Sequence, residues 1–404
     1  MSSAHRTLAI LAFTQIASWG SLYYGITILG PALGAELGWR NELVYGAYSW
    51  SLILSGLAAT PAGALLDRHG GRAVMGLGSL LGAFGMLLLA GTQSVPVYFV
   101  AWTILGFAMA LTLYEAAFAT INREFGWDAR QLISTLTLFG GFASTVFWPL
   151  TMRLDGAIGW RATCVAYAAL HLFVCLPLHL CLPRRAHGSA TPANESGAVG
   201  AVADLDLRTA LRHPAFWKLA CAFAVNALIF SALAVHLIPM LKDFGHGAAA
   251  AVTMAALIGP AQVAGRIAER VWFRDAPPAN IGRLAFAAMP AGLLAIGLWA
   301  EHQWAAGLFC VLLGASNGVL TIVRGTVPQQ MFGRRHYGAI AGAMAGPSLL
   351  ARAAGPLLTA ALLGAGVPGR MLLLVFLVCA VLSLLCFLSA LQAKRRAAIM
   401  DAPL

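Results

Sequence analysis

Charge is the scarcest property of this sequence. Only 10% of the 404 residues are charged, whereas 60% are hydrophobic, and the mean hydropathy is +0.78. An ordinary soluble domain carries about 25% charged residues, so this composition excludes a soluble globule. A helix that crosses the hydrocarbon core of a bilayer needs about 20 apolar residues. The chain is therefore long enough for twelve spans joined by short loops.

Lysine and paired cysteines are also scarce. The sequence has three lysines and no G-x-x-x-x-G-K-[ST] segment, which excludes the phosphate-binding loop of an ATP-driven pump. Its seven cysteines lie in apolar runs and form no C-x-x-C pair, so neither a disulfide framework nor a zinc site is indicated. We expect no cofactor and no metal.

What the sequence does contain is a series of long apolar runs, which predict an all-α membrane protein with twelve transmembrane helices. The first run continues to about Gly30, which is too long for a cleavable signal peptide. The predicted spans are 8–30, 43–66, 73–92, 95–121, 130–152, 160–182, 214–241, 247–271, 281–300, 303–326, 337–363 and 368–392.

One long interruption divides the chain. Residues 183–213 are rich in Ala, Gly, Ser and Pro and end in alternating acids and bases, which predicts a flexible cytoplasmic linker with a short helix near its end. The domains predicted on either side are 1–182 and 214–404. Each would be a six-helix bundle.

The loops predict the orientation. If the N-terminus is cytoplasmic, most Lys and Arg residues lie on the inside. The outer segments then hold only Arg40, Arg153, Arg161, Lys242 and Arg370. This bias places both termini in the cytoplasm of a bacterial-type inner (plasma) membrane. It also explains the net charge of +11 without nucleic acid as a partner. We expect a monomer embedded in the lipid bilayer.

The two halves repeat each other. Residues 111–115 in span four match residues 320–324 in span ten, and residues 148–150 in span five match residues 355–357 in span eleven. Matches that respect the numbering of the spans predict two pseudo-symmetric bundles.

A charged island stands between spans two and three. Residues 63–72 read G-x-L-x-D-R-x-G-x-R, which resembles the signature loop of major facilitator transporters. In this loop Gly63 would let backbones approach, and Asp67 would sit at the positive end of a helix dipole. Arg68 and Arg72 would reach carboxylates on neighbouring helix ends. We call these four residues the inner latch. The plainer alternative is a cytoplasmic loop that simply collects basic residues.

Three further segments resemble bacterial members of the monocarboxylate-porter group. They are Leu37-Gly-Trp39-Arg40, Gly46-Ala-Tyr-Ser49 and Gly159-Trp-Arg161. The resemblance implies a secondary transporter whose halves alternate access to a substrate site between them.

Ionised side chains inside the spans need an explanation, because each costs about 2.5–3.5 kcal/mol at the bilayer centre. Glu115 in span four and Arg324 in span ten occupy equivalent places in the two halves. Glu115 would carry the coupled proton, or it would close an inner gate by pairing with Arg324. The two roles are compatible.

The remaining arginines suggest the charge of the cargo. Arg352 lies near the middle of span eleven, where a guanidinium fits a carboxylate, although bonds to backbone carbonyls are an alternative. Arg324 shares a polar face of span ten with Asn317. We assign Arg266 in span eight to a weakened copy of the latch, because Gln262 stands where the resemblance requires an acid.

Amphipathic side chains complete the candidate site. Gln15, Trp19 and Tyr23 form a stripe on span one, and Asn226 lies within span seven. Such groups can orient a small organic ligand, although packing is the alternative for aromatic stripes.

Other functional classes fit less well. Gly314-Ala-Ser-Asn-Gly318 matches the G-x-S-x-G nucleophile pattern, but it lies in a long helix with no histidine at a suitable spacing. We therefore expect no enzyme, and a non-transporting scaffold is the other alternative. Within transport, the excess of arginine favours proton-coupled transport of a monocarboxylate-like metabolite over proton-driven export of a drug-like or amphipathic compound.

Overall fold

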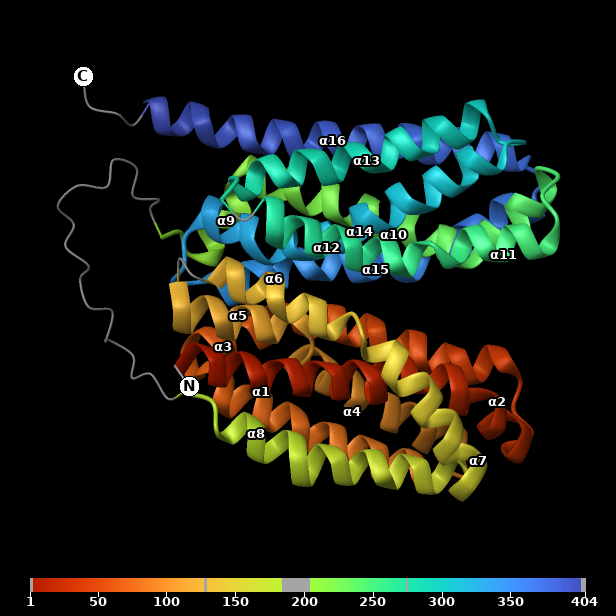
Figure 1. Ribbon diagram of the computed structural model, residues 1–404. Coiled ribbons are helices and arrows are strands. Elements are labelled where there is room, and N and C mark those ends of the chain that lie inside the picture. Colours follow the sequence, from red (N-terminus) through yellow and green to blue (C-terminus); the bar gives the residue numbers. More distant parts are fainter. Residues whose placement is uncertain (1–2, 127–128, 184–203, 274, 401–404) are drawn as a thin grey trace. The chain divides into compact units, whose positions relative to one another are not determined.

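The structure is a computed structural model that describes residues 3–126, 129–183, 204–273 and 275–400. These residues form helices and contain no β-strand, so the prediction of an all-α protein is confirmed. Long helices run side by side within each of two compact units (Figure 1).

The first unit comprises Met1–Asp204 and Phe332–Gly346, and the second comprises Leu205–Met331 and Pro347–Leu404. The first unit thus includes the beginning of a helix that the sequence assigns to the second half. Its own helices are α1 (Ser3–Ser18), the π-helical turn η1 (Trp19–Tyr24), α2 (Gly25–Leu37), α3 (Asn41–Ala90), α4 (Val95–Thr112), α5 (Tyr114–Phe125), α6 (Ala129–Gly140), α7 (Ala143–Leu170), the π-helical turn η3 (His171–Cys175) and α8 (Leu176–Leu180).

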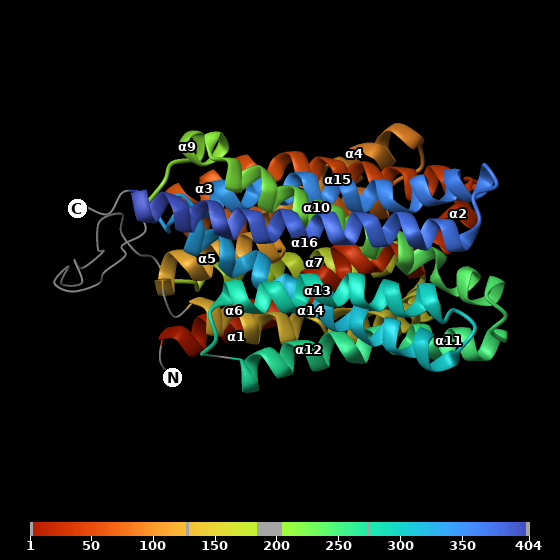
Figure 2. The ribbon, with the colours of Figure 1, turned by 90° about the horizontal axis from the view of Figure 1, so that it is seen from above.

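In the second unit, α10 and α13 both pack against α16, and Figure 2 shows α16 running along α10. Its helices are α9 (Leu207–Arg212), α10 (Pro214–Asp243), α11 (Ala248–Ala256), α12 (Ile258–Trp272), α13 (Pro278–Leu298), α14 (Gln303–Phe332), α15 (Tyr337–Gly364) and α16 (Gly369–Met400). The last residue of α14 and the first ten residues of α15 belong to the first unit.

Nine helical segments of the described chain are long and apolar enough to cross a membrane. Two of them contain a sharp break at a glycine with positive φ, Gly70 (77°) and Gly159 (78°), a conformation that glycine adopts without steric cost. Each therefore holds two of the predicted spans. The predicted first span, 8–30, falls on the continuous helical segment α1–η1–α2, which is not among these nine. With these breaks, the described helices fit the twelve-helix, two-bundle fold that the sequence predicts.

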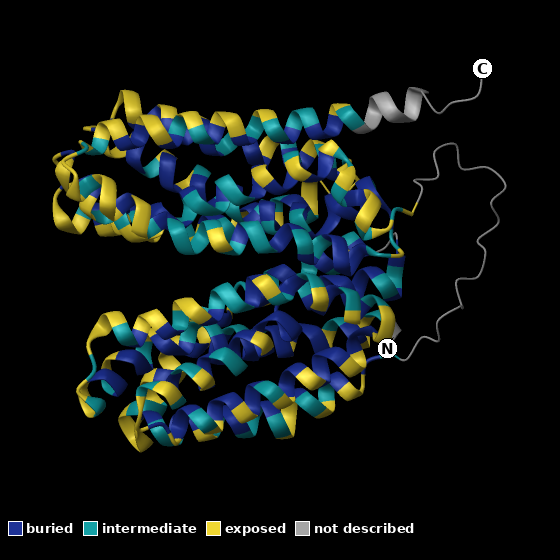
Figure 3. Cartoon of the chain, turned by 180° about the vertical axis from the view of Figure 1, so that it is seen from behind, coloured by how far each residue is buried: buried dark blue, intermediate teal, exposed yellow. Residues whose placement is uncertain are grey.

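Burial follows the membrane pattern. Large apolar side chains lie on the outer faces, with Phe173 71%, Leu357 73% and Trp272 77% exposed, and exposed residues line the outside of each unit in Figure 3. In a bilayer such faces contact lipid. Inside, Tyr98 and Trp102 form part of the core of the first unit, and Phe286 stacks on Phe387 in the second.

Most of the predicted linker, residues 184–203, lies outside the described residues. Its end is described. The expected short helix is α9, and its N-cap residue Asp206 accepts the backbone N–H of Thr209 at 2.9 Å.

Candidate functional site

Helix α3 crosses the beginning of α15 through two facing rows of small residues. On α15, Gly338 lies against the backbone of Gly63, Gly342 against that of Ala59, and Gly346 against that of Gly56, all three on α3. A Cβ atom on Gly63 would overlap the carbonyl group of Gly338, and one on Gly342 would overlap that of Ala59. Small residues at this spacing let two membrane helices approach to backbone contact.

Asp67 caps α15 at the end of this crossing. Its Oδ1 accepts the backbone N–H of Gly338 at 2.9 Å, and its Oδ2 accepts that of Ala339 at 2.9 Å. The first N–H groups of a helix have no partner within the helix, and here a residue from another helix supplies the acceptors. The latch aspartate therefore lies at the positive end of a helix dipole.

Burial raises the pKa of the Asp67 carboxyl to about 6. The N–H groups of Ala339 and Gly338 favour the ionised form and offset part of the effect, as do the charges of His336 and Arg123. The carboxyl at the cap can therefore change its charge close to physiological pH.

The other charged residues of the latch lie elsewhere. Arg68 and Arg72 are exposed, and no described carboxylate lies within ion-pair distance of either side chain. The backbone beside Asp67 is instead held by Arg123 of α5, whose Nη1 donates to the carbonyl oxygens of Leu66 and Asp67. Sequence reasoning counted Arg123 only as a loop charge, because nothing in its local sequence indicates a partner in α3.

The loop before α15 has a second acidic contact. Asp204, at the end of the linker, accepts the backbone N–H groups of Arg334 at 2.6 Å and Arg335 at 3.2 Å through Oδ1. Two carboxylates thus hold the backbone that leads into α15, which fixes where the helix begins.

The aromatic stripe of span one lies on the π-helical turn η1. Gln15, which is fully buried, orients it: its Nε2 donates to the carbonyl oxygen of Thr112 at 2.6 Å, and its Oε1 accepts from Trp19 Nε1 at 3.2 Å. Thr112 is the last residue of α4, and Leu113 has extended backbone (ψ −166°) between α4 and α5. The break in span four thus lies beside the stripe.

Rings from three further spans join those of span one. Trp19 contacts Tyr23 and Tyr114 with ring centroids 4.9 and 5.1 Å apart. Further ring contacts extend the group to an aromatic cluster of Trp19, Tyr23, Tyr24, Tyr48, Tyr114 and Trp148. Glu115 follows Tyr114 in the first turn of α5 and is half-buried. The structure therefore brings Gln15, Trp19 and Tyr23 close to the segment that carries Glu115.

The second unit holds a polar group between α12 and α14. Asn317 Nδ2 donates to Gln262 Oε1 at 3.2 Å, and Arg266 Nε donates to the carbonyl oxygen of Gly318 at 3.4 Å. Arg266 is 5% exposed. The residue that stands in place of the expected acid, Gln262, is therefore the direct partner of a predicted site residue.

The G-x-S-x-G segment forms the crossing of these same helices. Cβ atoms on Gly314 and Gly318 would overlap the carbonyl oxygens of Ile258 and Gln262, and Ser316 donates to the carbonyl oxygen of Ala285 at 2.7 Å. Its glycines serve close helix packing, and its serine is committed to the backbone. The nucleophile pattern has a structural explanation.

The other predicted site residues lie within spans of the second unit. Arg324 on α14 and Arg352 on α15 are half-buried, and Asn226 on α10 is 5% exposed. Each lies within a helix of the second unit.

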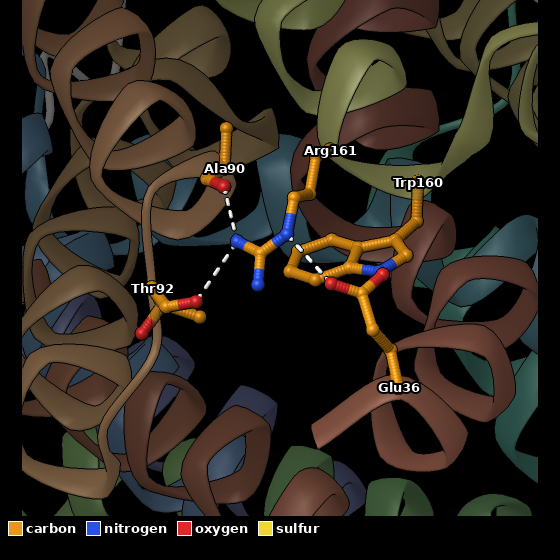
Figure 4. Close-up of polar contacts among 5 residues, drawn as sticks. All are labelled: Glu36, Ala90, Thr92, Trp160 and Arg161. Atoms are coloured by element: carbon orange, nitrogen blue, oxygen red, sulfur yellow. Dashed lines mark hydrogen bonds and ion pairs between the residues drawn. The ribbon is translucent and has the colours of Figure 1, made fainter.

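The opposite end of the first unit is held by one arginine (Figure 4). Arg161 donates to Glu36 Oε1 at 2.8 Å and to the carbonyl oxygens of Ala90 and Thr92 at 2.6 and 2.8 Å, and it stacks on Trp160. Trp160 Nε1 donates to Glu36 Oε2 at 2.6 Å. The hydrogen bond from Arg161 lowers the pKa of the Glu36 carboxyl. These contacts, which we call the outer clamp, give the Gly159-Trp-Arg161 segment a mechanical role.

Comparisons with known proteins agree with this architecture. The family model described as Major Facilitator Superfamily matches residues 8–356. A protein of Thermoproteus tenax described as an uncharacterized 38 kDa protein in the 23S RNA operon is 28% identical over 80% of this chain and 79% of its own length.

Two solved structures share the fold. The human organic anion transporter MFSD10 is 19% identical, with a TM-score of 0.62, over 96% of this chain and 97% of its own. The proton:xylose symporter XylE, bound to 6-bromo-6-deoxy-D-glucose, is 12% identical, with a TM-score of 0.72, over 95% of both chains.

Proposed function

The chain belongs to the Major Facilitator Superfamily of membrane transporters, and from this premise we propose that it moves a small, monocarboxylate-like organic anion together with protons. It is a multi-pass membrane protein and not an enzyme. Alternating access to a central substrate is the working principle of such two-bundle carriers.

The observation that carries the choice of an anion is the charge inside the second unit. Its spans hold the arginines Arg266, Arg324 and Arg352. The predicted spans of this unit contain one acidic residue, Glu269 in α12. An excess of guanidinium groups in a low-dielectric interior favours a substrate of opposite charge. Arg352 and Arg324 are the proposed anion-binding residues, with Asn317 and Asn226 as neutral partners.

The proposed coupling residue is Glu115. It lies at the break between α4 and α5, and the aromatic cluster stands beside it. Interrupted helices are common at the substrate and ion sites of secondary transporters. The two solved structures of the same fold are an organic anion transporter and a proton:xylose symporter, which supports both parts of the proposal.

The inner latch is proposed to gate the cycle. Helix α15 passes from the first unit to the second between Gly346 and Pro347, so the cap at Asp67 and the crossing at Gly63 hold a helix that both units share. Making and breaking these contacts would let the chain change state without altering the binding residues.

The remaining features of the proposal concern the membrane. The latch end of the first unit carries Arg68, Arg72 and Arg123, and the outer clamp lies at the opposite helix ends. The positive-inside rule then favours a cytoplasmic latch and cytoplasmic termini in a bacterial-type inner membrane. We propose that the monomer is the working unit.

A second candidate function is proton-driven export of a drug-like or amphipathic compound. It is favoured by the aromatic cluster, because Trp19, Tyr23 and Tyr24 are half-buried rings with polar tips that suit an amphipathic ligand.

Purified protein in liposomes tests these proposals. Under an imposed pH gradient, radiolabelled lactate, pyruvate or benzoate should accumulate, and tetraphenylphosphonium should not move. Movement of the cation alone would replace the anion proposal with the exporter. If no solute moved with or without the gradient, while the family fold was retained, transport of these classes would be rejected.

A further inference from the structure

Two histidines that the proposed mechanism does not use are buried in the first unit. His171 and His179 lie in span six and are both 0% exposed. Each has one ring nitrogen bonded to a serine, at 2.8 Å in both cases: His171 Nε2 to Ser21 Oγ, and His179 Nδ1 to Ser79 Oγ. Buried polar groups in a membrane protein are costly, so the presence of these two side chains calls for an explanation.

The partner of His171 lies in the segment that carries the aromatic stripe. Ser21 belongs to η1, the π-helical turn Trp19–Tyr24, and His171 opens the second π-helical turn, η3. Such turns are frequent at functional sites. On η1 the residues Gly20, Ser21 and Leu22 are buried, whereas Trp19, Tyr23 and Tyr24 are half-buried. One side of the turn is anchored, and the other presents the rings.

The hydrogen bonds of Ser21 determine which nitrogen of His171 carries the proton. The hydroxyl of Ser21 donates to the carbonyl oxygen of Ala17 at 2.7 Å. A hydroxyl has one hydrogen to donate, so His171 must donate through Nε2–H and Ser21 Oγ must accept. In the neutral ring Nδ1 is then an acceptor, and within the described chain it has no partner.

The surroundings of His171 favour the neutral ring. Gly82 of α3 packs beside it, 3.3 Å from Nδ1 when a Cβ is placed there, and no described carboxylate bonds to it. A buried cation without a counter-ion is strongly disfavoured. The neighbouring titratable side chains along the same span are Cys175 and His179. From the neighbouring spans one and three, the ring is faced by Ser21 and Gly82, which carry no charge.

We propose that His171 is a positioning residue: as a neutral donor it holds Ser21 and thereby fixes the turn that presents Trp19, Tyr23 and Tyr24 to the substrate. Phe147 secures the same turn from α7, because its ring fills the space that a Cβ on Gly20 would need. The substrate part of this inference rests on the proposed function, whereas the fixing of the turn does not.

Hydrogen–deuterium exchange of the full chain in lipid nanodiscs tests the fixing of the turn without any substrate. His171→Phe and Ser21→Ala should each speed amide exchange in residues 17–25 roughly three- to tenfold, as expected for one lost hydrogen bond. His171→Gln keeps a donor near the position of Nε2 and should restore slow exchange. His179→Phe is the matched control, since it removes the other buried histidine and should leave residues 17–25 unchanged. Unchanged exchange in His171→Phe would overturn the inference.

Transport kinetics with lactate, pyruvate and benzoate test the consequence for the substrate. His171→Phe should raise KM roughly three- to tenfold with little change in kcat, and His171→Gln should return KM towards the wild-type value. If His171→Gln lost pH-driven uptake but kept counterflow of the carboxylate, His171 would be a proton carrier and the neutral positioning role would be refuted. If the wild-type chain moves none of these carboxylates, the proposed function fails while the exchange experiment still decides the fixing of the turn.

Discussion

The carboxylate of Asp67 accepts the backbone N–H of Gly338 at 2.9 Å, across most of the length of the chain. Gly338 also lies at the tightest point of the crossing between α3 and α15, against the carbonyl of Gly63. One side chain therefore caps a helix while its neighbour one turn earlier provides the space that the helix needs. This relationship makes the inner latch testable residue by residue.

Gly63→Ala should prevent the close crossing. The new Cβ would overlap the backbone of Gly338, and such overpacking costs about 1–3 kcal/mol. We expect a turnover that is lower by about tenfold or more, with little change in substrate affinity, measured by uptake in liposomes. Gly46→Ala in the same helix is the control, because a Cβ there meets nothing within 4 Å. Equal effects of both changes would contradict the crossing as the cause.

Asp67 should make the latch sensitive to pH. At the cap its pKa is about 6, whereas that of an ordinary aspartate is 3.8, so the capped state binds the proton more tightly than a state with Asp67 in water. Between these values, lowering the pH should favour the capped state, and raising it through about 6 should remove that preference. Spin labels on α3 and α15 would measure the capped population. Asp67→Asn cannot titrate, so a pH step of the same midpoint in this variant would refute the assignment.

Glu115→Gln should separate proton coupling from substrate movement. The amide has nearly the shape of the carboxyl but cannot carry a proton. We expect pH-driven uptake to be abolished while counterflow exchange of the same solute continues. The two modes can be compared in one liposome preparation with and without the gradient. Uphill transport that survives the change would assign the coupling proton to another residue.

Arg352→Lys should weaken anion binding while the positive charge is kept. A guanidinium presents two parallel N–H donors to a carboxylate, and an ammonium cannot reproduce that arrangement. The expected loss of affinity is about tenfold, from the strength of charge-assisted hydrogen bonds, and isothermal titration or thermal shift with the transported carboxylate would measure it. Unchanged affinity would show that Arg352 does not hold the ligand.

Arg161→Lys should loosen the outer clamp and lower the melting temperature without affecting affinity. Arg161 reaches Glu36 through Nε and the carbonyl oxygens of Ala90 and Thr92 through Nη1, and the single Nζ of lysine cannot occupy both positions. Arg40→Lys serves as the control, since Arg40 forms only an exposed pair with Glu42 at 3.3 Å and such pairs contribute little. A melting temperature that is lowered equally in both variants would argue against the clamp.

For much of the candidate site, the sequence predicts which residues take part but not which residues they contact. The stripe of Gln15, Trp19 and Tyr23 follows helical spacing, but its partners Thr112 and Tyr114 belong to a distant span. Arg123 and His171 gave no signal in the sequence, because an arginine at a helix end and a histidine in an apolar run are common. Gln262 was noted in the sequence only because it stands where the resemblance requires an acid, and in the structure it accepts a hydrogen bond from Asn317.

The membrane class, the helical fold and the place of the latch could be predicted from the order of residues alone, because long apolar runs have one stable form in lipid and charges must gather at their ends. The folded chain was needed to show which backbone Asp67 caps, why small residues recur on α3 and α15, and which carbonyl groups Arg161 and Arg123 bind. The physical reason is that hydropathy acts on each segment separately, whereas caps and close crossings depend on which segments meet.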